Sequence, residues 1–485
     1  MRIPLPLVLF TLASVPCVRA QGPSAQGITP AEYAARREAL AAAIDSGVVL
    51  AFGAPDPTRI DRWTQLPAFR YLTGFLEPNA AFLLVKRGGK TEGTLFTATR
   101  DPRRMLYEGF PPDSATVARE TGLQVRALPA LRPLVDSLVG LGLPIYDLGD
   151  YASADVAQTD SLTRGWRFLT QLRAEEFSHP PVIRDAHVIV DSLRAKKSPA
   201  EMALLRRSID ITVASLKHAI QAVKPGMWEY QAEAMIEGGF RSAGADGTSF
   251  GSIIGSGPNS TQYHYEANNK QMASGEVVVM DVGAEYRGYA ADVTRTVPVN
   301  GRFTPEQRAV YQLVRDAQAA AEKVAKPGAS WQAWSDTARA VEARGLAKLG
   351  LIESVDATFD PPWADTCKAR PQACKQAFLY MAHGLGHGIG LEVHDAPRRA
   401  EKFEVGQVFT IEPGVYVSTK LLDMLPDTPK NRQMIAKVRK AVERYRNIGV
   451  RIEDDYVITP GGVEWLSRAP REIAEIEKLK LVSGR

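Results

Sequence analysis

Two segments of the chain, more than a hundred residues apart, follow one pattern that contains a carboxylate. In each, a glycine is followed by a largely apolar run, an acid six positions later and a second glycine two positions beyond the acid. The segments are Gly275–Gly283, which contains Asp281, and Gly406–Gly414, which contains Glu412. Such an internal repeat predicts two duplicated halves with equivalent structures.

The repeat extends on both sides of these segments. Upstream, Lys-Pro-Gly precedes a helical stretch with a tryptophan in both copies, at residues 224–228 and 326–331. Downstream, each copy contains one more acid, Asp292 in the first and Glu453 in the second. An acid on an apolar strand is costly to bury unless a cation meets it. The four acids therefore predict a shared cationic centre between the halves. The alternative is that they are strand-end acids facing solvent.

The acids of the first half fall on a predicted β-hairpin. Its arms are residues 277–286 and 289–297, joined by a two-residue Arg-Gly turn. In that register Asp281 lies opposite Thr294, and Asp292 is its diagonal neighbour on the same face. Two carboxylates at this spacing repel each other unless a cation lies between them, so the hairpin favours metal chelation.

Three histidines, His383, His387 and His394, lie within twelve residues and are interleaved with four glycines. The glycines disfavour a helix and let the backbone approach a small site closely. A helical H-E-x-x-H zinc site is excluded, because its glutamate is missing. A single histidine of this kind is more typical of a core or a turn. The three together, with His264, are interpreted as site residues.

The set of ligand types indicates which metal such a site would hold. Four carboxylates and one imidazole are rich in oxygen and carry four negative charges, which two divalent ions would neutralise. The set favours manganese, with cobalt or zinc able to substitute. Two ions about 3.5–4 Å apart would share bridging carboxylates and a water that becomes a hydroxide near neutral pH and attacks a carbonyl. Nucleophilic serine chemistry is not expected.

Length and composition indicate two domains in a globular chain of 485 residues. Short apolar runs alternate with helical stretches from about residue 48 to 184, which is typical of an α/β domain. We expect an N-terminal domain over 21–185, a catalytic domain over 190–462 that begins with a capping box at Ser198, and a C-terminal tail over 463–485. The net charge of only +4 argues against nucleic acid as a partner.

Residues 1–20 are typical of a secretory signal sequence, with a basic start, an apolar run and small residues before Ala20. The run is too short to span a bilayer. Cys17 leaves a lipoprotein site as a disfavoured alternative, because a proline precedes it. Two cysteines remain after cleavage, Cys367 and Cys374, and we expect them to form a local disulfide. The mature protein is therefore predicted to be secreted or periplasmic, without a membrane segment.

Together, these motifs resemble the creatinase/prolidase-type pita-bread metallopeptidases, and most closely the aminopeptidase P group. The resemblance covers nearly the whole mature chain. Its matching parts are residues 69–79, the spacing from His264 through Asp281 to Asp292, the histidine run, and residues 411–414 and 449–455. It implies an α/β (α+β) fold, with a creatinase-like N-terminal domain followed by a pseudo-two-fold pita-bread catalytic domain.

The resemblance also implies the metal ligands. Asp281 would bind one ion and His387 the other, whereas Asp292 and Glu453 would bridge both. Glu412 would bind metal and act as the general base that accepts the proton of the attacking water.

Further roles follow from the same resemblance. His394 would stabilise the tetrahedral oxyanion. His264 and His383 would line the substrate site, and Arg451 would support the acids. An apolar slot for the P1′ proline, whose ring is fixed and whose nitrogen carries no hydrogen, could reject other residues. The implied activity is release of the N-terminal residue from peptides with proline in the second position.

Several alternatives stay open. A prolidase would accept only Xaa-Pro dipeptides. A metal-free binding protein and a creatinase-like hydrolase are disfavoured, because all five ligand-type side chains are present. Two longer segments, 351–378 and 419–445, could reshape the substrate mouth, so the preferred peptide length stays open, as does a homo-oligomer. His179, His187 and His218 are expected to be structural.

Overall fold

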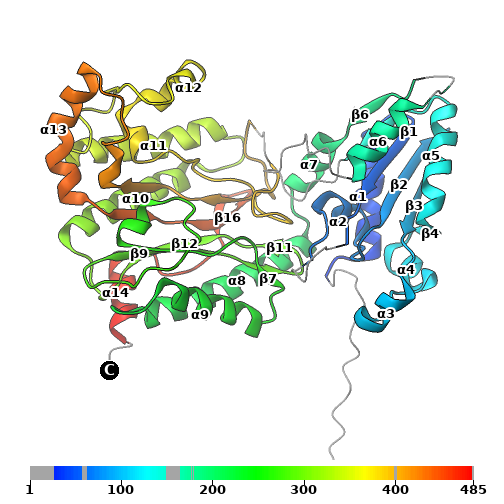
Figure 1. Ribbon diagram of the computed structural model, residues 1–485, viewed down its shortest axis with the longest axis horizontal. Helices are drawn as coiled ribbons and strands as arrows, with labels where there is room; N and C mark the ends of the chain where they lie inside the picture. The colour runs from blue at the N-terminus through cyan, green and yellow to red at the C-terminus, as the bar shows by residue number, and fades with distance from the viewer. Residues whose placement is uncertain are drawn as a thin grey trace, which may run out of the picture.

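The computed structural model describes residues 27–56, 63–148, 164–175, 177, 180–397 and 401–482. The predicted signal sequence, Cys17 and His179 lie outside the described residues. Figure 1 shows a smaller N-terminal lobe and a larger C-terminal lobe, with α7 (His187–Ala195) between them. Both lobes combine helices with strands, which confirms the predicted α/β class.

A six-stranded sheet forms the centre of the N-terminal lobe. Its strands in chain order are β1 (Gly47–Phe52), β2 (Ala81–Arg87), β3 (Lys90–Thr97), β4 (Gln124–Ala127), β5 (Ile145–Asp147) and β6 (Ile183–Asp185). In space the order is β4-β3-β2-β1-β5-β6. The β1–β2 and β2–β3 pairs are antiparallel, and the other three pairs are parallel.

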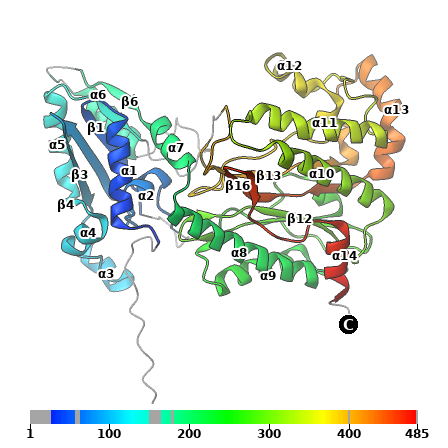
Figure 2. The same ribbon diagram turned by 180° about the vertical axis from the view of Figure 1, so that it is seen from behind.

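Helices cover both faces of this sheet, which explains why β1 is buried along its whole length. They are α1 (Pro30–Ala42), α2 (Pro67–Thr73), α4 (Ser114–Thr121), α5 (Leu131–Gly140), which follows the single turn η1 (Leu128–Ala130), and α6 (Arg164–Ala174). The short helix α3 (Pro102–Glu108) buries no side chain and lies at the end of the lobe. Alternate side chains of β1 point to opposite faces. Val49 therefore joins the cluster of Leu40 on α1, and Val48 joins that of Val135 on α5 (Figure 2).

The C-terminal lobe contains two pairs of long helices and several short sheets. Its helices are α8 (Pro199–Ala222), α9 (Glu229–Ser242), α10 (Pro305–Val324), α11 (Trp331–Leu349), α12 (Ala364–Ala369), α13 (Pro429–Tyr445) and α14 (Ile473–Val482), with single turns η2 (Gly257–Thr261), η3 (Pro371–Cys374), η4 (Gln376–Leu379) and η5 (Thr419–Leu421). The α8–α9 pair and the α10–α11 pair lie on opposite sides of the strands in both Figure 1 and Figure 2.

The strands between these helix pairs also come in two sets. The first half supplies β7 (Gly247–Thr248), β8 (Ile253–Ser256), β9 (Val277–Val282), β10 (Ala284–Tyr286), β11 (Tyr289–Ala290) and β12 (Val293–Pro298). The second half supplies β13 (Val408–Ile411), β14 (Gly414–Val417), β15 (Ile448–Arg451), β16 (Asp454–Thr459) and β17 (Gly462–Trp465). The sheets have the orders β12-β9-β8, β11-β10-β7, β13-β16-β17 and β14-β15.

The predicted duplication is confirmed in local geometry. Both α8 and α10 begin with a capping box and a proline, at Ser198 and Thr304. In both Lys-Pro-Gly turns the glycine has a positive φ, and its amide donates to a backbone carbonyl about 45–75 residues downstream: Gly226 to Met272 at 2.9 Å and Gly328 to Phe403 at 2.8 Å. Equivalent bonds at equivalent places are what the pseudo-two-fold pita-bread arrangement requires.

The predicted hairpin has the expected register. Tyr286 pairs with Tyr289, and Asp281 pairs with Thr294. The structure differs in that each arm is split in two, at Gly283 and at Ala291–Asp292. The backbones approach so closely there that a Cβ on Gly283 would overlap the carbonyl oxygen of Ala291. Asp292 therefore lies in a strand break, where its side chain is turned into the lobe.

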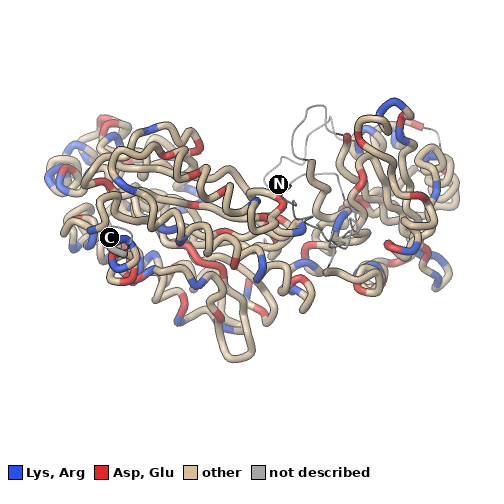
Figure 3. Tube along the Cα trace, turned by 90° about the horizontal axis from the view of Figure 1, so that it is seen from below, with Lys and Arg blue, Asp and Glu red and all other residues tan. Residues whose placement is uncertain are grey.

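The periphery of this lobe carries a disulfide-linked segment and two further helices. The predicted disulfide Cys367–Cys374 is formed, and residues 419–445 are largely helical, as α13. Beyond residue 460, β17 pairs with β16 and α14 contacts α8. Basic and acidic residues are interspersed along both lobes (Figure 3). Among the described residues, no helix is both long and apolar enough to cross a bilayer.

Candidate metal centre and active site

A cavity of about 800 Å3 opens between the two halves of the C-terminal lobe. It is lined by all nine predicted site residues, His264, Asp281, Asp292, His383, His387, His394, Glu412, Arg451 and Glu453. Apolar side chains complete the wall, among them Phe250, Ile253, Trp331 and Val393. None of the described residues in 351–378 or 419–445 lines it. The described residues of these two segments therefore lie outside the wall of this cavity.

Strand ends place the four acids around this cavity. Asp281 is the fifth residue of β9, and Asp292 directly precedes β12. Glu412 directly follows β13, and Glu453 directly precedes β16. The two halves are joined here, because the amide of Glu453 donates to the carbonyl of Thr294 at 3.1 Å. Acids from segments more than 100 residues apart thus face one another.

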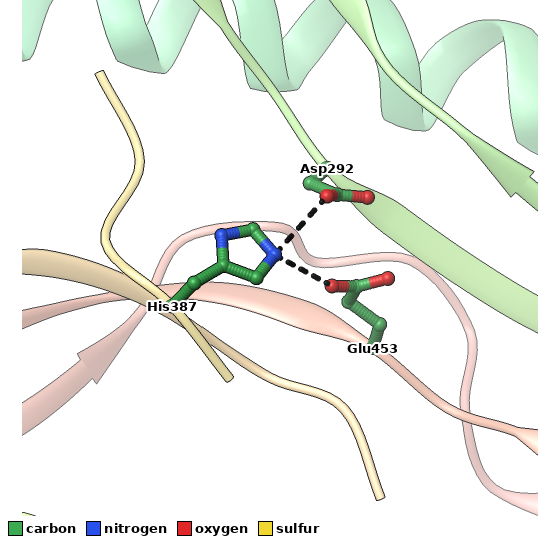
Figure 4. Close-up of side chains that lie close together, drawn as sticks. All are labelled: Asp292, His387 and Glu453. Atoms are coloured by element: carbon green, nitrogen blue, oxygen red, sulfur yellow. Dashed lines mark ion pairs between the residues drawn. The ribbon is translucent and has the colours of Figure 1, made fainter. Parts of the chain in front are cut away.

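Three side chains form the tightest cluster of metal-ligand types among the described residues. One ligand atom each of Asp292, His387 and Glu453 lies within 4.8 Å of the others (Figure 4). His387 Nε2 is 3.6 Å from Asp292 Oδ2 and 4.0 Å from Glu453 Oε1. Glu412 extends the cluster, with its Oε1 at 3.5 Å from the same nitrogen.

Asp281 belongs to a hydrogen-bonded chain on the same wall. It forms an ion pair with Arg451 Nη2, and Arg451 Nη1 donates to the hydroxyl of Tyr416 at 2.8 Å. That hydroxyl is also 2.8 Å from His383 Nε2. These hydrogen bonds fix His383 and Asp281 relative to each other through the guanidinium of Arg451, which is itself buried.

Burial and mutual repulsion make the acids hard to ionise together. Asp281, Asp292 and Glu453 are 6%, 5% and 2% exposed. Burial, followed by the charge of Glu453, raises the pKa of Asp292 well above its ordinary value. Burial, followed by the charge of Asp281, raises the pKa of Glu453 to about 8. Burial and the charge of Glu453 also raise the pKa of Glu412. A cation among these oxygens would reverse all three shifts.

The histidines are shifted in the opposite direction. Burial, followed by the nearby His394, lowers the pKa of His387 to about 4. Burial, followed by the charge of Arg451, lowers the pKa of His383 to about 3. Both rings are therefore neutral near pH 7, and a neutral imidazole has the lone pair that a metal ligand needs.

The unsatisfied oxygens of this site fit a divalent cation. Asp281 Oδ1, Asp292 Oδ1 and Glu453 Oε1 are buried and have no hydrogen-bond partner within the described part of the chain. A buried acceptor without a donor is costly, and a divalent cation supplies the missing positive charge. Carboxylate oxygens with one imidazole are a donor set that suits such ions.

Comparison with known proteins agrees with this geometry. The model of metallopeptidase family M24 matches residues 203–460, and that of the aminopeptidase P N-terminal domain matches residues 33–140. The chain belongs to metallopeptidase family M24, in its aminopeptidase P group. The Xaa-Pro aminopeptidase of Escherichia coli is 33% identical over 472 residues, which cover 94% of this chain and 99% of that protein.

Two further comparisons bear on structure and on specificity. The structure of E. coli aminopeptidase P with the inhibitor Pro-Leu superposes with a TM-score of 0.76 at 32% identity, covering 94% of this chain and 99% of that one. The human Xaa-Pro dipeptidase is 33% identical over 320 residues, which cover 60% of this chain and 61% of that protein.

The remaining predicted residues lie around the metal-ligand cluster. His264 is exposed on the cavity wall. The rings of His394 and His387 have centroids 4.3 Å apart. His187 begins α7 and His218 is exposed on α8, and neither lines the cavity.

Two tyrosines of the site, Tyr416 and Tyr263, were not among the predicted residues. Tyr416 bonds to both His383 and Arg451, and its ring lies 4.5 Å from that of Tyr263. Strand alternation could have indicated Tyr416, because it lies two residues after Gly414 and four after Glu412, on the same face. In the structure, a Cβ on Gly414 would meet the tyrosine hydroxyl at 2.5 Å. No comparable signal marks Tyr263.

A G-x-S-x-G pattern does occur, at residues 247–251, so the expectation that serine chemistry is absent cannot rest on the lack of this motif. Ser249 lies just after β7, and its hydroxyl donates to the backbone carbonyl of Ala291 at 2.8 Å. The serine thus supports the strand break beside Asp292, and it is not among the residues that line the cavity.

Proposed function

We propose that this M24 metallopeptidase is an Xaa-Pro aminopeptidase, which releases the N-terminal residue from peptides with proline in the second position. The observation that carries the proposal is the meeting of five ligand-type side chains from both halves in one cavity, with three buried carboxylate oxygens lacking a donor among the described residues. The match to a relative of that name along 94% of this chain and 99% of the relative supports it.

The ligand set suits two divalent ions, best manganese, with cobalt or zinc able to substitute. Asp281 would hold one ion and His387 the other, Asp292 and Glu453 would hold both, and Glu412 would complete the set. When bound, such ions polarise a carbonyl oxygen and lower the pKa of water.

The protein's own groups would carry the remaining chemistry. Glu412, whose Oε1 lies 3.5 Å from His387 Nε2, would accept the proton of the attacking water. His394 would donate to the oxyanion of the tetrahedral intermediate. Arg451, through its ion pair with Asp281, would hold that acid in its ligand orientation. His383 and His264 would contact the peptide from the cavity wall.

A prolidase restricted to Xaa-Pro dipeptides is the second candidate. The human Xaa-Pro dipeptidase supports it, because its identity of 33% equals that of the E. coli relative. That match covers only 60% of this chain, however, whereas the aminopeptidase match covers 94%. The longer match favours the aminopeptidase.

We also propose that the protein acts outside the cytoplasm. The Cys367–Cys374 disulfide supports an oxidising compartment. The signal sequence proposed for residues 1–20 agrees with it.

A substrate panel tests the proposed function. We expect cleavage of Xaa-Pro-Xaa peptides with release of the first residue, and slow or no cleavage when alanine replaces the proline. An Xaa-Pro dipeptide assayed at the same concentration separates the two candidates. Cleavage of the dipeptide alone would establish the prolidase, and equal rates on proline and alanine peptides would refute both.

A further inference from the structure

The loop that carries His394 is tied together by the carboxylate of Asp395. Asp395 Oδ2 accepts the amide of Leu391 at 3.0 Å, and Oδ1 accepts that of Ala396 at 2.7 Å. The backbone amide of Asp395 donates to the carbonyl of Gly388 at 2.7 Å. One residue therefore closes the loop on both sides of His394 and fastens it beside the segment of His387.

Two cations from the segment that joins the lobes hold this carboxylate. Arg194 Nη2 lies 2.6 Å from Asp395 Oδ1 and 2.6 Å from Glu392 Oε2. Lys197 Nζ lies 3.2 Å from Asp395 Oδ2 and donates to the carbonyls of Ala396 and Arg194 at 3.3 and 2.7 Å. The side chains of Arg194, Lys197 and Asp395 are at most 2% exposed.

A buried cluster of charged side chains such as this one contributes little net stability to a fold. Burial of each ion costs several kcal/mol, and well-packed apolar side chains of similar volume are often as stable. The gain is a fixed geometry, since charged groups with several bonds tolerate only one arrangement. That arrangement lies directly beside His394, whose ring is 4.3 Å from the ring of His387.

The surrounding backbone is shaped for the same contact. Gly390 lies so close to Asp395 Oδ2 that any Cβ there would overlap it. Lys197 is fixed in turn, because its amide donates to the carbonyl of Gly406 at 2.9 Å. Leu391, in the same loop, packs against the cores of both lobes. The loop is thus fastened where the two lobes meet.

We propose that Asp395 is a positioning residue for His394, held in place by Arg194 and Lys197 of the segment that joins the lobes. Through this contact the placement of the N-terminal lobe would fix the direction in which His394 points into the cavity. The inference rests on the proposed function, in which His394 stabilises the oxyanion.

A double-mutant cycle tests the inference on the full-length, metal-loaded protein, with Asp395→Asn, His394→Gln and the double variant assayed on an Xaa-Pro-Xaa peptide. We expect Asp395→Asn to lower kcat at least about tenfold with KM nearly unchanged, because a misplaced group loses its transition-state contact. In the His394→Gln background the same change should have almost no further effect. Bound metal per chain should stay at the wild-type value in all variants.

Conservative and matched controls complete the design. Arg194→Lys keeps the charge and should retain most of kcat. If Asp395→Asn fails to fold, Arg194→Gln takes its place, with a loss of kcat expected in the wild-type background and almost none in the His394→Gln background. Lys196→Gln removes an exposed ion pair with Glu404 in the same segment and should change nothing. Equal losses of kcat in both His394 backgrounds, or an unchanged kcat in Asp395→Asn, would overturn the inference. Failure of the wild-type protein on every Xaa-Pro peptide would instead overturn the proposed function, and this inference with it.

Discussion

At the scale of single residues, Glu342 shows how far burial can change an acid that looks ordinary in the sequence. It lies on α11 and is 3% exposed. It lies near the backbone amide of Gly414, two residues after Glu412. Burial raises the pKa of Glu342 to about 8, although the nearby Arg339 and the amide of Gly414 act in the opposite direction.

Replacement of this acid should change how stability depends on pH. The unfolded chain loses the proton near pH 4.5, whereas the folded protein keeps it to about pH 8. The stability contributed by the protonated form is therefore fully present below pH 4.5 and is lost as the pH rises to 8. Relative to Glu342→Gln, the wild type should lose on the order of a few kcal/mol across this range.

Thermal midpoints of both proteins between pH 5 and pH 8.5 measure this effect. The control is Asp336→Asn, an exposed acid on the same helix, which should give a difference from the wild type that does not vary with pH. A pH-independent difference for Glu342→Gln as well would show that Glu342 ionises normally.

Residue contacts were predictable only where local geometry determines them. The register that places Asp281 opposite Thr294 follows from a two-residue turn and strand alternation, and it is confirmed. Glu342 and Tyr416 depend on contacts between segments far apart in the chain, which no local pattern specifies. The roles of the nine cavity residues rest on resemblance and stay proposals.

At the scale of elements, the disulfide-linked segment 351–378 lies away from the cavity. Part of it forms a separate hollow with α11, lined by residues such as Val355, Lys375 and Phe378. Its length suggested a role at the substrate mouth, because a sequence shows that a segment is long but not which face it covers.

Loss of the disulfide should therefore affect stability and not catalysis. The double variant Cys367→Ser/Cys374→Ser should unfold more readily, by about 2–3 kcal/mol for so short a loop. Its kcat/KM on an Xaa-Pro-Xaa peptide should stay within about twofold of the wild-type value, because neither cysteine lines the cavity. A tenfold fall in kcat/KM with metal fully bound would show that this segment does shape the active site.

The hairpin illustrates a second limit at this scale. Composition predicts two continuous arms, yet both are split, at Gly283 and at Asp292. The break arises from close contact between the arms, supported by Ser249. Strand propensity describes a single segment, whereas a break of this kind depends on its neighbours.

At the scale of the whole molecule, the duplication was the most informative signal. Equivalent turns, caps and strands in both halves specify the pseudo-two-fold fold, and the acids at equivalent strand ends face one cavity. The placement of the N-terminal lobe was not predictable, because it involves contacts between segments far apart in the chain, among them the buried ion pairs of Arg194 and Lys197 with Asp395.

The most direct test of a metal centre shared by the halves is a titration of metal-free protein with Mn2+, followed by calorimetry and by aminopeptidase activity. We expect about two ions per chain, with activity rising in parallel. Asp281→Asn and Glu453→Gln, one from each half, should both weaken binding, whereas the surface variant Glu464→Gln should not. Wild-type activity without bound metal, or undiminished Mn2+ binding in both acid variants, would contradict the account.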